Sequence, residues 1–469
     1  MNNTEEQQCS EKPRNRKSYQ CTKCYPSCEW WLSVLTNSTL LLLSWAVPWS
    51  IVGNDCLPGG NLFGIIILTD CCVLAGIVVS IIPIPKLPPL PPLLGMLLAG
   101  FVLRNIPGTD AVITAIQSSW SSTLRSLALT IILVKAGLEL DASLLKKMKG
   151  VCIRLTAIPC LVEAVTCAIA AHLLLNFPWE WGFLLGFVLG AVTPAVIVPS
   201  LLELQDKGFG VEKGIPTLVI AASSFDDVLA ISGFSVVLGI TFSTGTGVMS
   251  FQTLGPLEMA GGILIGIILG VFLWFIPSPK QKHVARTRSM LVLGFGVLAL
   301  FGSRAASFPG AGALAAIVTP FVAALRWKSD KEPISRFVGS FWTVFEPIMF
   351  GLIGAEIAIE KMDGKAVAMG IAVLLICLLF RTLATFGAVS FAGLNVKEKL
   401  FVCFSWIPKA TVQAAIGPVA LDTAKKAGAS EYFINIAEQV LTVAVLSILI
   451  TAPLGAAAIG LSGPKLLDR

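Results

Sequence analysis

The sequence is poor in charged residues and in histidine. Only 13% of its 469 residues are charged, 55% are hydrophobic, and the mean hydropathy is +0.82. This balance excludes an ordinary soluble protein and is typical of a chain that crosses a membrane many times. The net charge of +6 does not indicate nucleic-acid binding, because lysine and arginine stand in short clusters between apolar runs, as in cytoplasmic loops.

The candidate metal ligands are also sparse. The two histidines, His172 and His283, are too few and too far apart to form a metal site. The segment CTKCYPSC, with Cys21, Cys24 and Cys28, has neither a second cysteine pair nor a histidine partner. We therefore expect a reduced tail there and not a zinc site. The N-terminus also has no early apolar core with a cleavage site, so no cleaved signal peptide is expected.

Apolar runs bounded by charges, glycine or proline predict an all-α polytopic membrane protein with about fourteen transmembrane helices. Loops rich in lysine and arginine, such as KKMK and KQKHVARTR, alternate with loops such as NFPWE that hold neither. The positive-inside rule then predicts that both termini are cytoplasmic. The predicted helices are 30–52, 62–82, 89–104, 122–141, 151–176, 181–204, 214–242, 257–277, 289–303, 309–326, 337–358, 365–393, 400–422 and 431–457.

Two long segments of the chain resemble each other. One runs from KAGLELDASLLKKMKG to LGAVTPAVIVPSLLE, and the other from LIGAEIAIEKMDGKAV to SWIPKATVQAAIGPVALD. The separation in sequence between Glu139 and Glu163 is nearly the same as that between Glu356 and Arg381. The matched helices are the fifth and the twelfth, so they run in opposite directions. This pattern predicts two inverted-topology repeats, which are typical of secondary transporters.

Proline interrupts the sixth and thirteenth predicted helices. AVTPAVIVP holds Pro194 and Pro199 in mid-span, and IPKATVQAAIGP holds Pro408 and Pro418. Proline removes a backbone donor, and unwound backbone survives in a membrane only inside protein or beside a wet cavity. We expect the two broken helices to cross at the membrane midplane. There Lys409 would compensate the dipole ends of the half-helices.

Four ionisable side chains lie near the same depth. AASSFDDVLAISGF places Asp226 and Asp227 about a dozen residues into their helix, or roughly 18 Å. Glu163 and Arg381 project to a similar level. Unpaired charges there cost several kcal/mol each, so we expect a site for a small cation. Because Glu163 and Arg381 are repeat equivalents of opposite sign, we expect them to form a structural ion pair.

The residue types at this level suit a hard monovalent cation. Na⁺ and Li⁺ prefer oxygen ligands, which carboxylates, hydroxyls and carbonyls supply. One carboxylate oxygen can hold a proton at low pH and a metal ion at higher pH, so competition for it already makes an exchange mechanism. Neighbouring aspartates on a helix point about 100° apart, so one can face the ion while the other has a structural partner. The candidate ligands are Asp227, Asp226, Thr193, Ser223 and Ser224, with Na⁺ or Li⁺ at Asp227.

These motifs resemble a known superfamily. SSFDDVLA, the TP break, the helix with Arg381 and IPKATVQAA are similar to the monovalent cation/proton antiporters, most closely the animal NHA-type sodium/proton exchangers of solute-carrier family nine, subfamily B. The similarity spans about residues 62–457. It implies a homodimer in which a six-helix core moves past a scaffold like an elevator. It implies that Asp227 carries the ion and the proton with Asp226 beside it, that Thr193 and Pro194 form the first crossover, and that Lys409, Ala410 and Thr411 form the second.

The resemblance and the helix count together predict the domain organisation. The linker helix has three glycines spaced by four, Gly262, Gly266 and Gly270 in GGILIGIILG, and this spacing predicts a close-packed face. The expected segments are a cytoplasmic tail (1–29), an accessory first helix (30–52), a first scaffold segment (53–150), a first core segment (151–242), the linker helix (243–288), a second scaffold segment (289–363), a second core segment (364–457) and a cytoplasmic tail (458–469).

Arg381 departs from the electrogenic bacterial pattern, in which a lysine stands on this helix. Arginine does not deprotonate in practice, so a proton carried by this basic residue is excluded. We expect Arg381 to be held by Glu163, which would leave Asp226 less constrained. Two aspartates would allow two protons per ion, but the arginine favours electroneutral one-to-one exchange.

The predicted function is therefore a Na⁺ (Li⁺)/H⁺ antiporter of the plasma membrane or an organelle membrane, with no enzymatic activity and no cofactor. A sodium-coupled symporter of similar topology stays open, and it would need a cavity for an organic substrate. A cation channel fits Arg381 and desolvated acids less well than alternating occupancy does. An intramembrane aspartyl protease is disfavoured, because neighbouring acids on one helix cannot converge on one proton.

Overall fold

The computed structural model describes residues 28–82, 90–140, 150–242, 251–278, 281–306, 308–327, 330–361 and 364–468. Over these ranges the chain is helical and contains no strand. Eleven helices are long and apolar enough to cross a membrane, and two shorter apolar helices accompany them. An all-α polytopic membrane protein is thus confirmed, while the count of fourteen spans stays a prediction. The cysteine motif at Cys21 and Cys24 lies outside the described residues.

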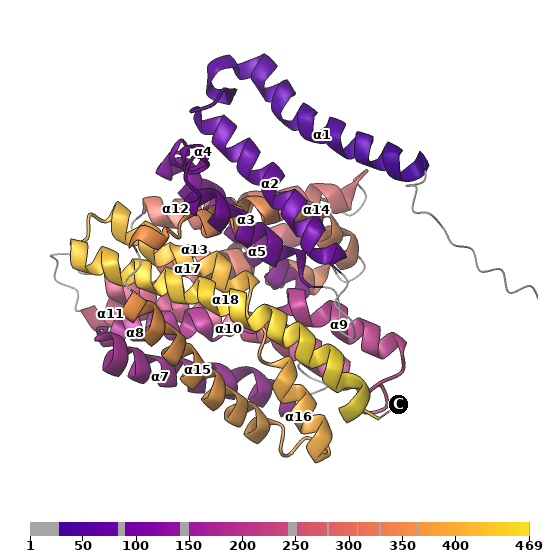
Figure 1. The fold of residues 1–469 in the computed structure, drawn as a ribbon. Helices are drawn as coiled ribbons and strands as arrows, with labels where there is room; N and C mark the ends of the chain where they lie inside the picture. The colour runs from indigo at the N-terminus through magenta and orange to yellow at the C-terminus, as the bar shows by residue number, and fades with distance from the viewer. Residues whose placement is uncertain are drawn as a thin grey trace, which may run out of the picture.

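Figure 1 shows the helices packed side by side in one bundle, with α1 projecting from it. Each predicted helix coincides with one described helix or with a broken pair. In chain order they are α1 (Cys28–Val52), η1 (Gly53–Cys56), α2 (Asn61–Ile81), α3 (Pro92–Asn105), α4 (Asp110–Thr114), α5 (Ser118–Glu139), α7 (Val151–Leu175), α8 (Trp179–Leu189), α9 (Pro194–Asp206), α10 (Ile215–Phe242), α11 (Phe251–Phe275), α12 (Val284–Ala305), α13 (Pro309–Arg326), α14 (Lys331–Ala355), η2 (Ile359–Lys361), α15 (Gly364–Ala388), α16 (Val396–Ser405), α17 (Thr411–Lys426) and α18 (Glu431–Leu466).

Both proline-bearing helices are broken, but at only one proline each. The first break lies between α8 and α9, where Pro194 takes the first helical position and its missing N–H costs no helical bond. The second lies between α16 and α17 and contains Pro408. Pro199 and Pro418 were expected to take part in the breaks, yet they lie inside α9 and α17. Neighbouring helices can satisfy the single carbonyl that each of them frees.

The last helix continues beyond its predicted end. α18 ends at Leu466, whereas the sequence pattern placed its end at residue 457. The added turns stay packed against the chain, since Gly210 N–H donates to the carbonyl of Asp468 over 2.7 Å and the side chain of Leu467 lies beside Gly210. Most of the segment expected as a tail at 458–469 is therefore helix.

The packing divides the helices into two groups. In one, α7 packs on α8 and α15, α10 packs on α8, and α17 packs on α18. We call α7–α10 with α15–α18 the aspartate group, because it carries Asp226 and Asp227. In the other, α3 packs on α2 and α14, while α13 packs on α5, α11 and α12. We call these helices the flanking group. α1 makes its main contacts with α2 and η1, and lies apart from both groups in Figure 1.

The glycine face predicted on the linker helix is present. Gly262, Gly266 and Gly270 of α11 all face α13. A Cβ at Gly262 would overlap the carbonyl oxygen of Ala311, and one at Gly270 would stand 2.8 Å from that of Thr319. The predicted close-packed face is confirmed, and it brings α11 and α13 into backbone contact.

Candidate functional site

The two helix breaks touch each other inside the aspartate group. Thr193 N–H donates to the carbonyl of Pro408 over 3.1 Å, and Ala410 N–H donates to Thr193 Oγ1 over 2.6 Å. Lys409 N–H donates to Thr451 Oγ1 of α18 over 2.9 Å. Backbone groups that have lost their helical partners are thus satisfied by the other break or by a neighbouring helix, as a buried membrane site requires.

Arg381 lies in the C-terminal half of α15, and its guanidinium reaches both breaks. Nη1 donates to the carbonyl of Gly190 over 2.5 Å, and Nε donates to that of Trp406 over 3.1 Å. These carbonyls stand at the C-terminal ends of α8 and α16. Helix C-termini carry partial negative charge, so one buried cation stabilises both half-helices.

Glu163 of α7 binds two cations. It contacts Arg381 Nη1, which is the pair expected from the sequence, and its Oε1 lies 2.7 Å from Lys409 Nζ. Lys409 Nζ also donates to the carbonyl of Leu189, so it faces a helix end as expected. All three side chains are buried. Lys409 therefore shares the work of neutralising Glu163.

Asp226 is held more tightly than the sequence suggested. Its Oδ2 accepts from Arg381 Nη2 over 2.9 Å and from Val192 N–H over 2.8 Å. The expectation that Asp226 would be less constrained is wrong. Because Lys409 also binds Glu163, and because the guanidinium fork can address two carboxylates at once, Arg381 joins Glu163 to Asp226.

These four side chains form a balanced cluster of two acids and two bases, which we call the four-charge cluster: Glu163, Asp226, Arg381 and Lys409. Each member has a partner of opposite charge in direct contact. Buried ions cost several kcal/mol each unless they are paired and hydrogen-bonded, so the cluster depends on all of its members.

Asp227 points elsewhere. It lines a cavity of about 550 Å³ that also exposes Glu139 at the end of α5, and we call this the Glu139 cavity. Only 7% of Asp227 is exposed, and among the described residues its Oδ1 has no hydrogen-bond partner. The two adjacent aspartates of α10 therefore have different surroundings, because their side chains leave the helix about 100° apart.

The predicted oxygen ligands divide between the cavity and the buried breaks. Ser224, Pro194 and Thr411 line the Glu139 cavity together with Asp227. Thr193 and Ser223 are fully buried away from it. The Ser223 hydroxyl donates to the carbonyl of Ile220 over 2.9 Å. The Thr193 hydroxyl is the acceptor for Ala410, so these two residues fasten backbone at the site.

Sequence reasoning missed two polar residues here. Gln413 of α17 is buried and its Nε2 donates to the carbonyl of Ala191 over 2.8 Å, while its Oε1 has no partner among the described residues. An amide directly after a helix break in an apolar run was the available signal. Glu139 was noted only as a marker of the repeat, yet it lines the cavity with Lys135, whose Nζ lies 3.7 Å from Glu139 Oε1.

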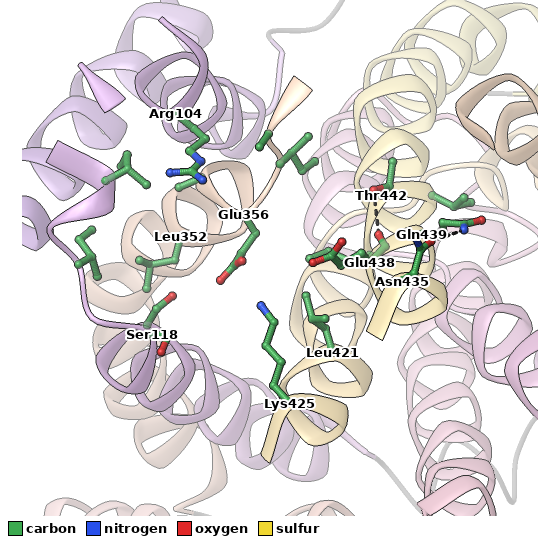
Figure 2. Close-up of a pocket in the computed structure, with 18 of the residues that line it drawn as sticks. Arg104, Ser118, Leu352, Glu356, Leu421, Lys425, Asn435, Glu438, Gln439 and Thr442 are labelled. Atoms are coloured by element: carbon green, nitrogen blue, oxygen red, sulfur yellow. Dashed lines mark hydrogen bonds between the residues drawn. The ribbon is translucent and has the colours of Figure 1, made fainter. Parts of the chain in front are cut away.

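A second cavity of about 460 Å³ lies at the opposite ends of the same helices. α5 begins at Ser118, which lines this second cavity, and ends at Glu139. Figure 2 shows Glu356 and Lys425 reaching into it from opposite walls, so we call it the Glu356 cavity. Beside it, Arg125 of α5 lies 2.7 Å from Glu356 and 2.7 Å from Asp422 of α17. This ion triad binds the flanking group to the aspartate group.

Comparison with known proteins identifies the family. The family model described as "Sodium/hydrogen exchanger, transmembrane" matches residues 72–460. The chain belongs to the sodium/hydrogen exchanger family. It is 54% identical over 436 residues to sodium/hydrogen exchanger 9B2 of Homo sapiens, a match that covers 93% of this chain and 81% of that protein. It is 45% identical to sodium/hydrogen exchanger 9B1 of Homo sapiens, covering 93% and 84% respectively.

The fold is also known from an archaeal protein. The sodium proton antiporter MjNhaP1 from Methanocaldococcus jannaschii matches with a TM-score of 0.66 over 87% of this chain and 100% of its own, at 22% sequence identity. The resemblance inferred from the motifs is confirmed. This exchanger-family member is a multi-pass membrane protein, and its family is one of transporters and not an enzyme class.

Substitution of Arg381 tests the four-charge cluster. Arg381→Met leaves two buried acids with one cation, and we expect a loss of about 3–5 kcal/mol in stability. The matched control is Arg336→Met, which removes the exposed partner of Glu332 and should cost about 0–1 kcal/mol. Thermal unfolding in detergent micelles measures both. Equal unfolding midpoints for the two variants would contradict the role given to Arg381.

Proposed function

We infer that the protein is a sodium (lithium)/proton antiporter in which Na⁺ or Li⁺ and H⁺ compete for Asp227. The observation that carries this proposal is the difference between the two aspartates. Each aspartate has an Oδ1 without a partner among the described residues, but Asp226 is held through its Oδ2 by Arg381 and a backbone N–H, whereas Asp227 lines a cavity that Asp226 does not. A carboxylate so placed can take a proton or, with hydroxyls such as those of Ser224 and Thr411, a small cation.

The same difference argues against the other classes. A protease needs two carboxyls that share one proton, but Asp226 is committed to Arg381 and Asp227 faces away from it. A channel needs a path that is open at both ends. Asp227 lines the Glu139 cavity and does not line the Glu356 cavity. Between the two cavities α5 and α17 pack together, and the ion pair between Arg125 and Asp422 joins them. Access from one side at a time favours a transporter.

The charge balance favours electroneutral exchange. The four-charge cluster is neutral by itself, and Arg381 cannot release a proton in practice. Asp227 remains as the group that changes occupancy, taking one proton or one monovalent cation. One charge then crosses in each direction per cycle.

We assign the aspartate group to the moving core and the flanking group to the scaffold of an elevator. The positive-inside pattern puts the Glu139 cavity on the cytoplasmic side, so this conformation is open inward. Arg125 precedes Glu139 by the same number of positions as Trp342 precedes Glu356. At these positions, which the proposed repeat relates, Arg125 on the Glu356 side forms an ion pair with Asp422 of the core. Trp342 on the Glu139 side lines the cavity instead.

A homodimer is also proposed. No residue in the apolar window of α1 is buried in a single chain, and α1 makes its main contacts with α2 and η1. A partner chain and lipid would cover this surface.

Exchange in proteoliposomes tests the function. With an imposed Na⁺ or Li⁺ gradient and a pH dye inside, the protein should move protons in saturable fashion, and Asp227→Asn should abolish this flux because an amide cannot exchange a proton for a cation. Glu203→Gln, which changes an exposed acid on α9, is the control and should retain full flux. Normal exchange by Asp227→Asn would refute the site. Sodium flux that requires an organic solute would instead indicate a symporter.

The stoichiometry has its own test. A two-proton exchanger moves one net charge per cycle, and about 100 mV would then shift its equilibrium by about 2.3 kcal/mol, or about 50-fold. One-to-one exchange has no such dependence. We expect the Na⁺-driven proton flux to stay unchanged when potassium and valinomycin clamp the membrane at different voltages, and a systematic voltage dependence would contradict electroneutrality.

Cross-linking tests the elevator. Arg125→Cys combined with Asp422→Cys places thiols on the scaffold and the core where their native side chains touch. A short bis-maleimide should stop exchange, because it holds the core in the conformation open at Glu139. Each variant that carries only one of the two substitutions, treated with the same reagent, is the control and should keep its flux. Full exchange by the cross-linked double variant would rule out motion across this seam.

A further inference from the structure

Glu139 brings a scaffold charge next to the ion site. Its side chain is 38% exposed and lines the cavity that Asp227 lines. It comes from α5 of the flanking group, whereas Asp227 is on α10 of the aspartate group. The cation paired with it is Lys135, 3.7 Å away and itself 38% exposed. Such an exposed pair within one helix is a weak one.

Glu356 is the counterpart of Glu139 on the other face. Each acid follows a glycine by two positions at the C-terminal end of a long scaffold helix, Gly137 in α5 and Gly354 in α14. These glycines make equivalent contacts. A Cβ at Gly137 would overlap a carbonyl oxygen of α13, and one at Gly354 would overlap a carbonyl oxygen of α3. The two acids therefore occupy matched places at opposite ends of the scaffold.

Their electrostatic surroundings differ. Glu356 lies 2.7 Å from Arg125, which is 4% exposed, and Lys425 reaches toward the same cavity (Figure 2). Both partners of this ion pair, α5 and α14, belong to the scaffold. The pairing of Glu356 therefore does not depend on where the core stands. On the Glu139 face, the position equivalent to Arg125 is Trp342, which carries no charge.

We propose that Glu139 is a positioning residue that strengthens cation binding at Asp227 only while the site is open to the Glu139 face, and that Glu356 gives no equal help on the other face. This inference rests on the proposed antiport. A second negative charge near Asp227 favours a bound Na⁺ or a bound proton over an empty, doubly charged site, so its effect on Na⁺ affinity is measured at alkaline pH, where protons no longer compete. Cavities with low-dielectric walls increase this effect, because they focus the field.

Glu139 strengthens cation binding on one face of the membrane only, because it belongs to the scaffold and does not move with the core. The aspartate group would carry Asp227 and the four-charge cluster past the flanking group, so the charge of Glu139 acts on the ion in one conformation. The ion would then leave more readily on the far side, where Glu356 is already paired with Arg125. Affinity thus differs between the two faces although Asp227 is the same ligand on both.

Side-specific kinetics test the inference. In inside-out and right-side-out vesicles, Glu139→Gln should raise the KM for Na⁺ offered at the Glu139 face by about threefold to tenfold. The KM at the other face and the maximal rate should change less than about twofold, because Glu139 does not travel with the ion. Added choline chloride should shrink the difference from the native protein, since salt screens a charge that acts through water. Glu139→Asp should restore the native KM.

Two further variants complete the experiment. Glu332→Gln removes an 81%-exposed acid near the same face but outside the cavity, and its KM should be native. Glu356→Gln should leave the KM at the Glu356 face within about twofold of native, because that acid is already paired. The inference is overturned if Glu139→Gln has a native KM, or raises KM equally at both faces. If the native protein shows no Na⁺/H⁺ exchange, the proposed function fails instead.

Discussion

The guanidinium of Arg381 is the interaction on which the site depends. It binds Glu163, Asp226 and the C-terminal carbonyls of two interrupted helices, Gly190 and Trp406. Four separate segments of chain are thereby fixed around one permanent charge. Lys409 completes the set at Glu163. Every charge in this cluster has a partner of opposite sign. Of the two adjacent aspartates, Asp227 is therefore the one that faces the cavity, and this position underlies its proposed binding of a cation or a proton.

The two faces of the molecule carry different side chains at positions equally spaced from Glu139 and Glu356. Arg125 joins the flanking group to the aspartate group beside Glu356, whereas Trp342 lines the Glu139 cavity together with Asp227. Under the proposed elevator, an ion pair across the seam between the two groups would favour one conformation, and an apolar ring at the same place would not. The proposed inverted repeats would then share one backbone plan and still give the chain a preferred open side, where Glu139 stands as a loosely paired acid.

Much of the site could be predicted from the sequence, and the predictions that the structure contradicts have one cause in common. The depth of Asp226, Glu163 and Arg381 follows from counting residues along helices of constant rise, so their meeting at one level was predictable. The partner that each charge selects was not. Arg381 was expected to leave Asp226 less constrained, yet it binds Asp226 directly. The hydroxyl of Thr193 accepts a bond from the second break, and that of Ser223 donates within its own helix. These outcomes depend on how each helix is rotated about its own axis.

The sequence by itself determined the class of protein, the sites of the helix breaks and the family, because these depend on apolar run length, on proline and on local motifs. Only the tertiary structure decided that Asp227 is exposed to the cavity while Asp226 is bound, since a rotation of about 100° on one helix separates the two roles. It also brought together Arg125, Glu356 and Asp422, which are far apart in the chain and meet only when α5, α14 and α17 pack.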